Sequence, residues 1–309
     1  MSCIYPVYTY NAKNEPVLRP CGSCLQCRLD YSRDWSLRIN HEASLYEEND
    51  FVTLTYNDEH LPDDGSVSKL ELTKFIKRYR QRLYDESVFI RYFGVGEYGK
   101  VCANCGLSEP YCKQRGCQRF VPALGRPHYH VIIFGRSFPD RVPLFVSGKR
   151  LGKQRAGPDH SLYRSGQLEC LWDKGFSTVG EVTPESAAYC ARYVCKKIGG
   201  KVADEHYGDK TPEFALMSRM PGIGHDWFER FRTDVYPKDF CTLRGKRYSP
   251  PRYYDSLLAK VDGKLMESIK DERRRKAALK PYERDLRKRA KERYLEAKTK
   301  NLIRGYERR

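Results

Sequence analysis

The sequence of residues 128–135 is HYHVIIFG, two histidines that open an apolar, β-branched run. Such a run predicts a β-strand. Because side chains alternate between the two faces of a strand, His128 and His130 are expected side by side on the same face. Imidazoles in this arrangement can bind one metal ion. The alternative is two histidines that only pack or form hydrogen bonds.

Glu97 comes at the end of the preceding predicted strand, residues 87–96. If that strand pairs with residues 128–135, its carboxylate comes close to the two histidines. Two imidazole nitrogens and one carboxylate leave coordination positions open for substrate oxygens, and such a mixed site suits Mg²⁺ or Mn²⁺ presented with a phosphate. The sequence therefore predicts a divalent-cation site formed by His128, His130 and Glu97.

Strands and helices are interspersed around this predicted site. Further strands are predicted at 51–56 and 177–183, and helices at 23–48, 70–84 and 184–198. No regular βαβ repeat is visible, which favours an α+β fold with a central antiparallel sheet flanked by helices. The expected parts are a Cys-containing segment and helix (1–50), a core domain (51–200) with a Cys-rich insertion (100–120), an irregular extension packed on the core (201–263) and a basic helical tail (264–309).

The chain is strongly basic: its 309 residues include 57 Lys and Arg against 40 Asp and Glu, a formal net charge of +17. No apolar run approaches the roughly 18 residues of a membrane-spanning helix, and the first residues do not form a secretory signal. We therefore expect a soluble, intracellular protein with a polyanionic partner and no membrane. Residues 264–309 carry a net +10, which favours contact with phosphates, although such mixed-sign helices are also typical of a solvated surface.

The chain has twelve cysteines, and a first cluster of four lies within the insertion. In a reducing compartment, so many cysteines indicate thiols or metal ligands rather than disulfides. The cluster has the spacing C-x2-C-x6-C-x4-C, and four thiolates this close together can form a tetrahedral zinc site. A possible structural zinc is therefore assigned to Cys102, Cys105, Cys112 and Cys117.

A second cluster near the N-terminus contains Cys21, Cys24 and Cys27, with Cys3 as a possible fourth ligand. An iron–sulfur run of this type would need a further cysteine four residues after Cys27, where Tyr31 stands instead. The sequence leaves two interpretations open: a structural zinc, or free thiols at the start of a helix.

The predicted helix at 184–198 carries a second chemical motif. Thr183 can cap its N-terminus, and Pro184 suits its first position. Small and apolar residues at helical spacing form a packing face, and on roughly the opposite side lie Tyr189, Arg192, Tyr193 and Lys196. The tyrosines could be core aromatics, but the separate packing face argues against this. Two phenols one turn apart can meet one phosphate, and neighbouring cations and a metal would assist attack by an oxygen whose ordinary pKa is about 10.

The order of these motifs resembles that of the HUH endonucleases, the nicking enzymes that start rolling-circle DNA replication. The strand Thr53-Leu54-Thr55-Tyr56 comes first, then Glu97, then His128-Tyr129-His130, then the tyrosine-bearing helix. Flanking segments look like the replication initiators of microviruses, small icosahedral single-stranded DNA phages, with the gokushovirus branch closest: residues 20–28, 96–99, 126–130, 217–224 and 251–255. The resemblance spans about residues 3–258 and leaves the basic tail outside.

The resemblance implies a fold and a metal site. Residues 51–200 would be an HUH nuclease domain with an RRM-like palm. His128 and His130 correspond to the two metal-binding histidines of the family, and Glu97 stands where many members supply a third ligand for Mg²⁺ or Mn²⁺. The Cys-rich insertion replaces the short loop expected between Glu97 and His128.

The resemblance also implies a pair of nucleophiles. Tyr189 and Tyr193 correspond to the two catalytic tyrosines of one subclass, in which each tyrosine is followed three residues later by a lysine. Lys196 fits that pattern after Tyr193. Arg192 replaces the lysine after Tyr189, and arginine can stabilise charge but cannot readily give up a proton.

The implied activity is nicking and rejoining of single-stranded DNA at a phage origin through a 5′-phosphotyrosine, leaving a free 3′-OH as primer. The implied partners are single-stranded and origin DNA of the phage genome, a host polymerase and, since no NTPase motif is visible in the sequence, a host helicase in the bacterial cytoplasm. One alternative is a basic, zinc-stabilised single-stranded DNA-binding or packaging protein without enzymatic activity. Another is a metal-dependent nuclease that hydrolyses DNA without the tyrosines. Only the transferase leaves a covalent protein–DNA adduct.

Overall fold

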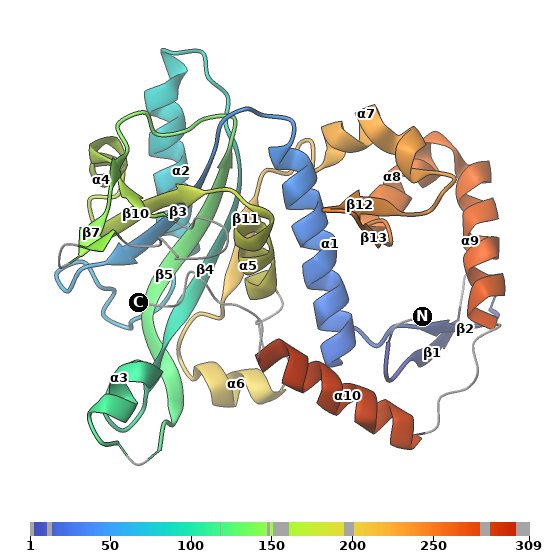
Figure 1. Cartoon of the computed structure of the whole chain (residues 1–309), viewed down its shortest axis with the longest axis horizontal. Helices are drawn as coiled ribbons and strands as arrows, with labels where there is room; N and C mark the ends of the chain where they lie inside the picture. The colour runs from blue at the N-terminus through green and yellow to red at the C-terminus, as the bar shows by residue number, and fades with distance from the viewer. Residues whose placement is uncertain are drawn as a thin grey trace. The chain divides into compact units, whose positions relative to one another are not determined.

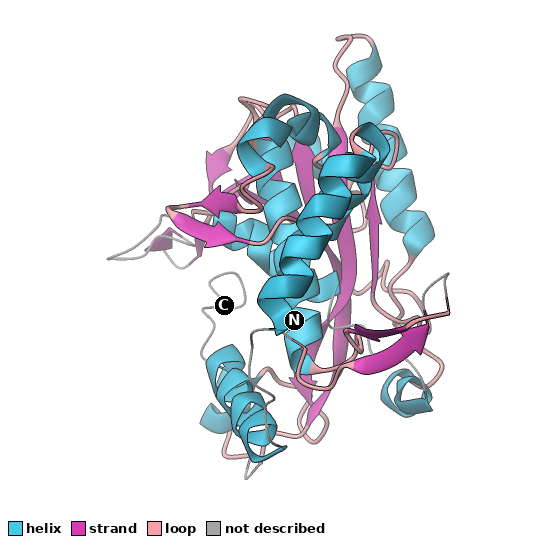
Figure 2. Cartoon of the chain, turned by 90° about the vertical axis from the view of Figure 1, so that its right-hand side faces the viewer, coloured by secondary structure: helices cyan, strands magenta, loops and turns pink. Residues whose placement is uncertain are grey.

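The computed structural model describes residues 3–10, 14–117, 119–146, 149–150, 161–194, 201–278 and 285–300. Over these residues, helices and strands are mixed along the chain (Figures 1 and 2). They fall into two compact units. The first unit contains the described residues up to His41 and those from Gly224 onward, and the second unit runs from Glu42 to Ile223.

The second unit is built on an antiparallel sheet that has seven strands among the described residues, in the order β11-β4-β5-β3-β10-β9-β6. The strands are β3 (Asn49–Tyr56), β4 (Arg91–Cys102), β5 (Pro122–Phe134), β6 (Val142–Pro143), β9 (Tyr163–Arg164), β10 (Gly175–Glu181) and β11 (Phe214–Met217). The α+β class and the central antiparallel sheet expected from the sequence are confirmed. A separate short hairpin pairs β7 (Phe145–Val146) with β8 (Lys149–Arg150).

Strands β4 and β5 form one long hairpin that extends into the Cys-rich insertion (Figure 1). The strand predicted at 87–96 begins instead at Arg91 and continues to Cys102. A bulge between Tyr98 and Lys100 shifts the register, after which pairing resumes and places Cys102 opposite Pro122. The insertion is therefore an extension of the sheet that carries α3 (Glu109–Gln114) near its tip.

One face of the sheet packs against α2 (Lys69–Tyr84) and α4 (Gly166–Leu171), and the other lies against α5 (Pro184–Val194) (Figure 1). Helix α2 begins after Ser68, whose hydroxyl accepts a hydrogen bond from the N–H of Glu71. Its apolar stripe meets alternate residues of β3 and β5. The shared core includes Val52, Leu54, Leu72, Phe75, Ile76, Tyr79, Tyr129, Val131 and Trp172.

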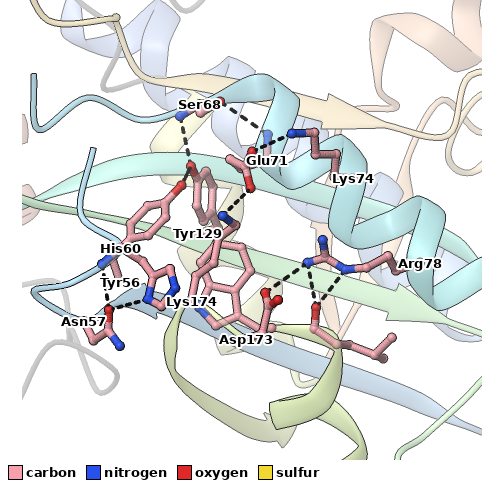
Figure 3. A network of polar contacts seen from close by, with 12 residues as sticks. Tyr56, Asn57, His60, Ser68, Glu71, Lys74, Arg78, Tyr129, Asp173 and Lys174 are labelled. Carbon is pink, nitrogen blue, oxygen red and sulfur yellow. Dashed lines mark hydrogen bonds and ion pairs between the residues drawn. The ribbon is translucent and has the colours of Figure 1, made fainter. Parts of the chain in front are cut away.

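Polar contacts under α2 fix the orientation of Tyr129 (Figure 3). Its hydroxyl oxygen lies 2.7 Å from that of Tyr56 and accepts a hydrogen bond of 2.9 Å from the backbone N–H of Ser68. Because Tyr129 points toward α2, strand alternation directs His128 and His130 to the opposite face. The core thus decides on which side of the sheet the histidines stand.

The helix predicted at 23–48 is α1 (Leu25–Ala43), which ends five residues earlier than expected. The side-chain amide of Asn49 donates to the carbonyl groups of Ala43 and Tyr46, both at 3.1 Å. These bonds satisfy carbonyl groups at the end of the helix and turn the chain into β3, since the last carbonyls of a helix have no partner within it.

Residues 201–263, expected to be an irregular extension, instead consist largely of regular elements. These are α6 (Lys201–Tyr207), β11, α7 (His225–Val235), β12 (Cys241–Leu243), β13 (Lys246–Tyr248) and α8 (Arg252–Val261). Strand β11 pairs with β4 at the edge of the central sheet, whereas the elements from α7 onward belong to the first unit. The Gly- and Pro-rich turns between short elements account for the irregular composition.

The first unit contains α1, the hairpins β1 (Val7–Tyr10)–β2 (Pro16–Arg19) and β12–β13, and the helices from α7 onward (Figure 1). The described part of the basic tail is helical, as predicted: α9 (Gly263–Ala278) and α10 (Asp285–Lys300). Helix α9 is nevertheless part of the core, because Met266 and Ile269 are buried against residues of α7 and α8. Arg273 forms ion pairs with Asp239 and Asp255. Within the described residues, no helix has both the length and the apolar character needed to cross a membrane.

Candidate active site

Strand register places three predicted ligands on the sheet face that meets α5. In the β4–β5 pair, Glu97 stands opposite His128, and Val95 stands opposite His130. On the other side of β5, Thr53 of β3 stands opposite His130. Directly opposed residues of antiparallel strands share a face, so these side chains converge across three neighbouring strands.

The carboxylate of Glu97 contacts both imidazoles. Its Oε1 atom lies 2.7 Å from Nε2 of His128 and 2.9 Å from Nε2 of His130. Glu97 and His130 are buried, with 2% and 3% of their surface exposed. Burial by itself would raise the pKa of Glu97, but the two imidazoles, His128 foremost, lower it to about 2. An ionised carboxylate therefore lies at the centre of the cluster.

The second ring nitrogen of each histidine is held by a neighbouring oxygen. Nδ1 of His128 donates to the backbone carbonyl of Arg126 at 3.2 Å, and Nδ1 of His130 lies 3.0 Å from the hydroxyl of Thr53. Partners of this kind orient metal-binding histidines, because they fix the ring and leave Nε2 as the ligand atom. Both Nε2 atoms point at the same carboxylate oxygen.

The donor set fits a divalent cation. One ligand atom from each of Glu97, His128 and His130 can be chosen so that all lie within 4.8 Å of one another. Two imidazole nitrogens and one carboxylate oxygen suit Mn²⁺ and tolerate Mg²⁺, and three protein ligands leave positions for phosphate oxygens.

Helix α5 brings the tyrosines to this cluster, and its N-terminus is capped as the sequence predicts. The N–H of Ser186 donates to the Thr183 hydroxyl at 3.2 Å, and the N–H of Thr183 donates to the Ser186 hydroxyl at 2.8 Å. Pro184 is the first residue of the helix. This reciprocal cap fixes where the helix starts, directly after β10, and thereby the direction in which its side chains project.

Both tyrosines of α5 contact His130. The hydroxyl oxygen of Tyr189 lies 3.3 Å from Nε2 of His130, and the two ring centroids are 5.0 Å apart. The ring of Tyr193 stacks on His130 with centroids 5.6 Å apart, and the two tyrosine rings meet edge to face at 4.8 Å. The structure thus gathers two phenols and the Glu–His–His cluster in one place.

The tyrosine side of α5 is buried, which corrects the expectation of a separate packing face. Ala187 and Ala191 are fully buried as predicted, but Tyr189 and Tyr193 are only 3% and 4% exposed. The helix therefore packs on both sides, because the tyrosines fill the space over His130. The guanidinium carbon of Arg192 lies 5.7 Å from the centroid of the Tyr189 ring. Lys196 lies outside the described residues.

Two neighbours of His130 were not predicted from the sequence. The ring of Phe51 stacks on His130 with centroids 5.5 Å apart and meets Tyr189 edge to face at 6.1 Å. Thr53 supplies the hydroxyl contact to Nδ1. Both residues occupy alternate positions of the predicted strand at 51–56, so its period of two, combined with the register to β5, is the signal that would have identified them.

The Cys-rich insertion forms a second cluster near the tip of the β4–β5 hairpin (Figure 1). The four predicted sulfurs, those of Cys102, Cys105, Cys112 and Cys117, lie within 4.8 Å of one another. The sulfurs of Cys102 and Cys117 are 3.9 Å apart. Backbone hydrogen bonds, that of Val121 first, lower the pKa of Cys102 to about 6, which favours the thiolate that a metal requires. The arrangement fits one tetrahedral zinc ion.

Comparison with known proteins places these elements in a family. Residues 49–104 and 121–198 match the family model of replication-associated protein ORF2. The matched segments include β3, the Glu–His–His cluster and the two tyrosines. The unmatched residues 105–120 contain three of the four cysteines in the insertion, so this tip is additional to the matched family pattern. No solved structure matches the chain.

Three curated relatives are phage proteins. The chain is 32% identical over 279 residues to "Replication-associated protein ORF2" of Spiroplasma virus 4, which covers 86% of this chain and 76% of the relative. It is 29% identical over 250 residues to "Replication-associated protein VP4" of Bdellovibrio phage phiMH2K, which covers 78% and 67%. It is also 29% identical over 246 residues to "Replication-associated protein ORF4" of Chlamydia phage 1, which covers 78% of this chain but 54% of that protein.

Proposed function

The chain belongs to the family of phage replication-associated proteins, and on that basis we propose that it is a metal-dependent DNA strand transferase of the HUH type that starts rolling-circle replication. The carrying observation is the 3.3 Å distance between the Tyr189 hydroxyl and the His130 ring nitrogen that faces Glu97. A potential nucleophile and a set of metal ligands therefore share one site on an antiparallel sheet.

Each side chain of the site has a distinct role in this proposal. His128, His130 and Glu97 hold a divalent cation, Mn²⁺ or Mg²⁺, which when bound polarises the scissile phosphate and neutralises its charge. Phe51 keeps the His130 ring in place by stacking on it. The almost complete burial of the cluster excludes water from the carboxylate. Exclusion of water favours attack by a tyrosine over hydrolysis.

The proposed reaction exchanges one phosphodiester for another. The oxygen of Tyr189 or Tyr193 attacks phosphorus, the bond from phosphorus to the 3′-oxygen breaks, and a 5′-phosphotyrosine forms. The phenol loses its proton and the leaving 3′-oxygen gains one, so atoms and charge balance. The Arg192 guanidinium stabilises charge beside Tyr189 but does not serve as a base, because arginine stays protonated. We propose Lys196 for the corresponding place beside Tyr193.

Two tyrosines suit a complete replication cycle. The free 3′-OH primes the host polymerase, and a host helicase opens the duplex ahead of it. After one round the second tyrosine cuts the regenerated origin, while the first remains joined to the original 5′ end until religation releases a circle. The edge-to-face contact of the two rings, with centroids 4.8 Å apart, lets both oxygens serve one metal-bound phosphate.

The remaining parts of the chain have supporting roles in this proposal. Cys102, Cys105, Cys112 and Cys117 hold a structural zinc that fixes the tip of the β4–β5 hairpin. The basic surface, including the tail, binds single-stranded and origin DNA of a phage genome, most similar to those of the gokushovirus branch. The protein acts in the cytoplasm of the infected bacterium.

A covalent adduct tests the proposed function. Purified protein, Mn²⁺ and single-stranded circular DNA that carries the phage origin are incubated and run on a denaturing gel. The proposal predicts a protein band shifted by attached DNA that survives SDS and disappears after nuclease digestion. Cleavage without an adduct would identify a hydrolytic nuclease. Binding without cleavage, with every origin fragment of the genome, would identify a single-stranded DNA-binding or packaging protein.

A further inference from the structure

Four cysteines of the first unit converge although they are spread over residues 3–27. The sulfur of Cys3 lies 3.6 Å from that of Cys21 and 3.8 Å from that of Cys24. The sulfurs of all four, Cys27 included, lie within 4.8 Å of one another. The ligand sulfurs of a tetrahedral zinc site are about 3.8 Å apart, since each Zn–S bond is about 2.3 Å long. Disulfide sulfurs would be only about 2.05 Å apart.

The backbone around these sulfurs is arranged to hold thiolates. The N–H of Cys24 donates to the sulfur of Cys21 at 3.3 Å, and the N–H of Cys21 donates to the sulfur of Cys3 at 3.3 Å. Gly22 has a φ of +78°, the left-handed conformation that lets the chain turn back between Cys21 and Cys24. Bonds from N–H groups to sulfur favour its ionised form, which is the metal ligand.

The apolar packing around the cluster is small. Ile4 and Leu295 are the other buried members, with Leu25 and Leu29 partly buried beside them. The β1–β2 hairpin, which joins Cys3 to Cys21, leaves most of its side chains exposed or half-buried. An isolated two-stranded hairpin is marginally stable in water, so something besides apolar burial must hold its base. A metal ion bound to four side chains supplies folding free energy of that kind.

We propose that Cys3, Cys21, Cys24 and Cys27 bind a structural zinc ion that closes the base of the β1–β2 hairpin. The same ion fixes the hairpin to the start of α1 and to α10, since Leu295 packs on the cluster and the Tyr5 hydroxyl donates to Glu292 at 2.8 Å. Four thiolates and no open ligand position make the site structural rather than catalytic. This inference does not depend on the proposed nuclease activity.

Zinc content of the full-length, reduced protein tests the proposal. Cys24→Ser should remove one equivalent of zinc, both in the wild-type chain and in a Cys102→Ser/Cys117→Ser background. The second background separates this ion from any zinc in the insertion. The matched control is Cys241→Ser, because Cys241 is also buried in the first unit but lies in another cluster. That variant should keep the full zinc content.

Limited proteolysis keeps the proposal testable if Cys24→Ser does not fold. In the Cys102→Ser/Cys117→Ser protein, a zinc chelator should open new cleavage sites within residues 4–20, and added zinc should close them. Cys3→His should retain the ion, because histidine is also a zinc ligand. Three results would each overturn the proposal: equal zinc in Cys24→Ser and its parent, iron in place of zinc, or a Cys3–Cys21 disulfide in protein isolated under reducing conditions.

Discussion

The hydroxyl oxygen of Tyr189 lies 3.3 Å from Nε2 of His130, although the two residues are 59 positions apart and belong to a helix and a strand. Two local features of the sequence produce this contact. The Thr183 cap fixes the start of α5, and the alternation of β5 turns His130 toward that helix. A phosphate held at His130 would therefore lie next to a phenol, which is the geometry that a transesterification needs.

The metal site gives the first prediction. His128→Ala combined with His130→Ala should abolish nicking, because two of the three protein ligands are lost. Binding of single-stranded DNA should remain within a fewfold of wild type, since basic side chains elsewhere supply most non-specific affinity. Glu97→Gln keeps the shape of the side chain but removes its charge, and it should cause a partial loss. Oligonucleotide cleavage across a Mn²⁺ titration measures these effects. Wild-type nicking by the double histidine variant would exclude the metal site.

The Cys-rich insertion gives a structural prediction. Cys102→Ser combined with Cys117→Ser should remove one zinc and lower the melting temperature. The rate of oligonucleotide cleavage by the folded fraction should stay within a fewfold of wild type, because this cluster lies beyond Glu97 toward the tip of the hairpin. Thermal unfolding and single-turnover cleavage are measured on the same preparation. A loss of cleavage without a loss of stability would instead assign the insertion a direct part in the reaction.

Charges on α10 predict how DNA binding depends on salt. Deletion of the tail is a poor test, because Met266 and Ile269 are buried in the first unit. Arg287→Gln with Arg293→Gln removes two exposed charges instead. If both contact single-stranded DNA, the slope of log K against log salt should fall by about 1.4. The matched control, Lys77→Gln with Arg82→Gln, removes two exposed charges of α2, on the sheet face away from the site. Equal slopes for both variants would make α10 an ordinary solvated helix.

His41 predicts how the stability of the first unit depends on pH. Its ring stacks on Trp227 with centroids 3.5 Å apart, and burial lowers its pKa to about 3. Because the unfolded pKa is about 6.5, the unfolded chain binds a proton that the folded chain refuses below that pH. The free energy of unfolding should therefore fall as pH drops from about 6.5 toward 3, by at most about 1.4 kcal/mol per pH unit.

His41→Phe tests this effect, because it keeps a ring against Trp227 but cannot titrate. Urea unfolding at a series of pH values should give a shallower pH dependence for the variant than for the wild-type chain. Parallel curves would show that His41 is not the titrating group.

The parts of the site that follow from local pattern could be predicted from the sequence. The period of two in residues 128–135 puts both histidines on one face, and the Thr183–Pro184 pair predicts the start of α5. Glu97 required one further assumption, that its strand pairs with β5. Phe51 and Thr53 required the register of a third strand, which residue pattern alone does not give.

Long-range packing accounts for what the sequence could not give. The cysteine triplet left zinc and free thiols equally open, because only tertiary structure brings Cys3 back to Cys21. The burial of α9 in the first unit was hidden by its high charge, since Met266 and Ile269 are its only buried residues among those described. Tyr189 and Tyr193 are buried because the sheet face beneath them is apolar and aromatic, a property of strands far away in the sequence.

The most direct test of the account is the identity of the residue joined to DNA. Phenylalanine keeps the ring and its packing on His130 but removes the attacking oxygen, so Tyr189→Phe and Tyr193→Phe are clean probes. Each single variant should retain some oligonucleotide cleavage, since the neighbouring phenol can attack, but neither should release unit-length circles. We favour Tyr193 for the first cut. Tyr79→Phe is the matched control, because Tyr79 is equally buried on the other sheet face.

The deciding measurement is peptide mapping of the adduct that wild-type protein forms with origin DNA in Mn²⁺, together with the adduct yield of the Tyr189→Phe/Tyr193→Phe variant. The account predicts a DNA-linked peptide whose modified residue is Tyr189 or Tyr193, and no adduct at all from the double variant. An adduct on any other residue, or a double variant that still becomes linked to DNA, would contradict it.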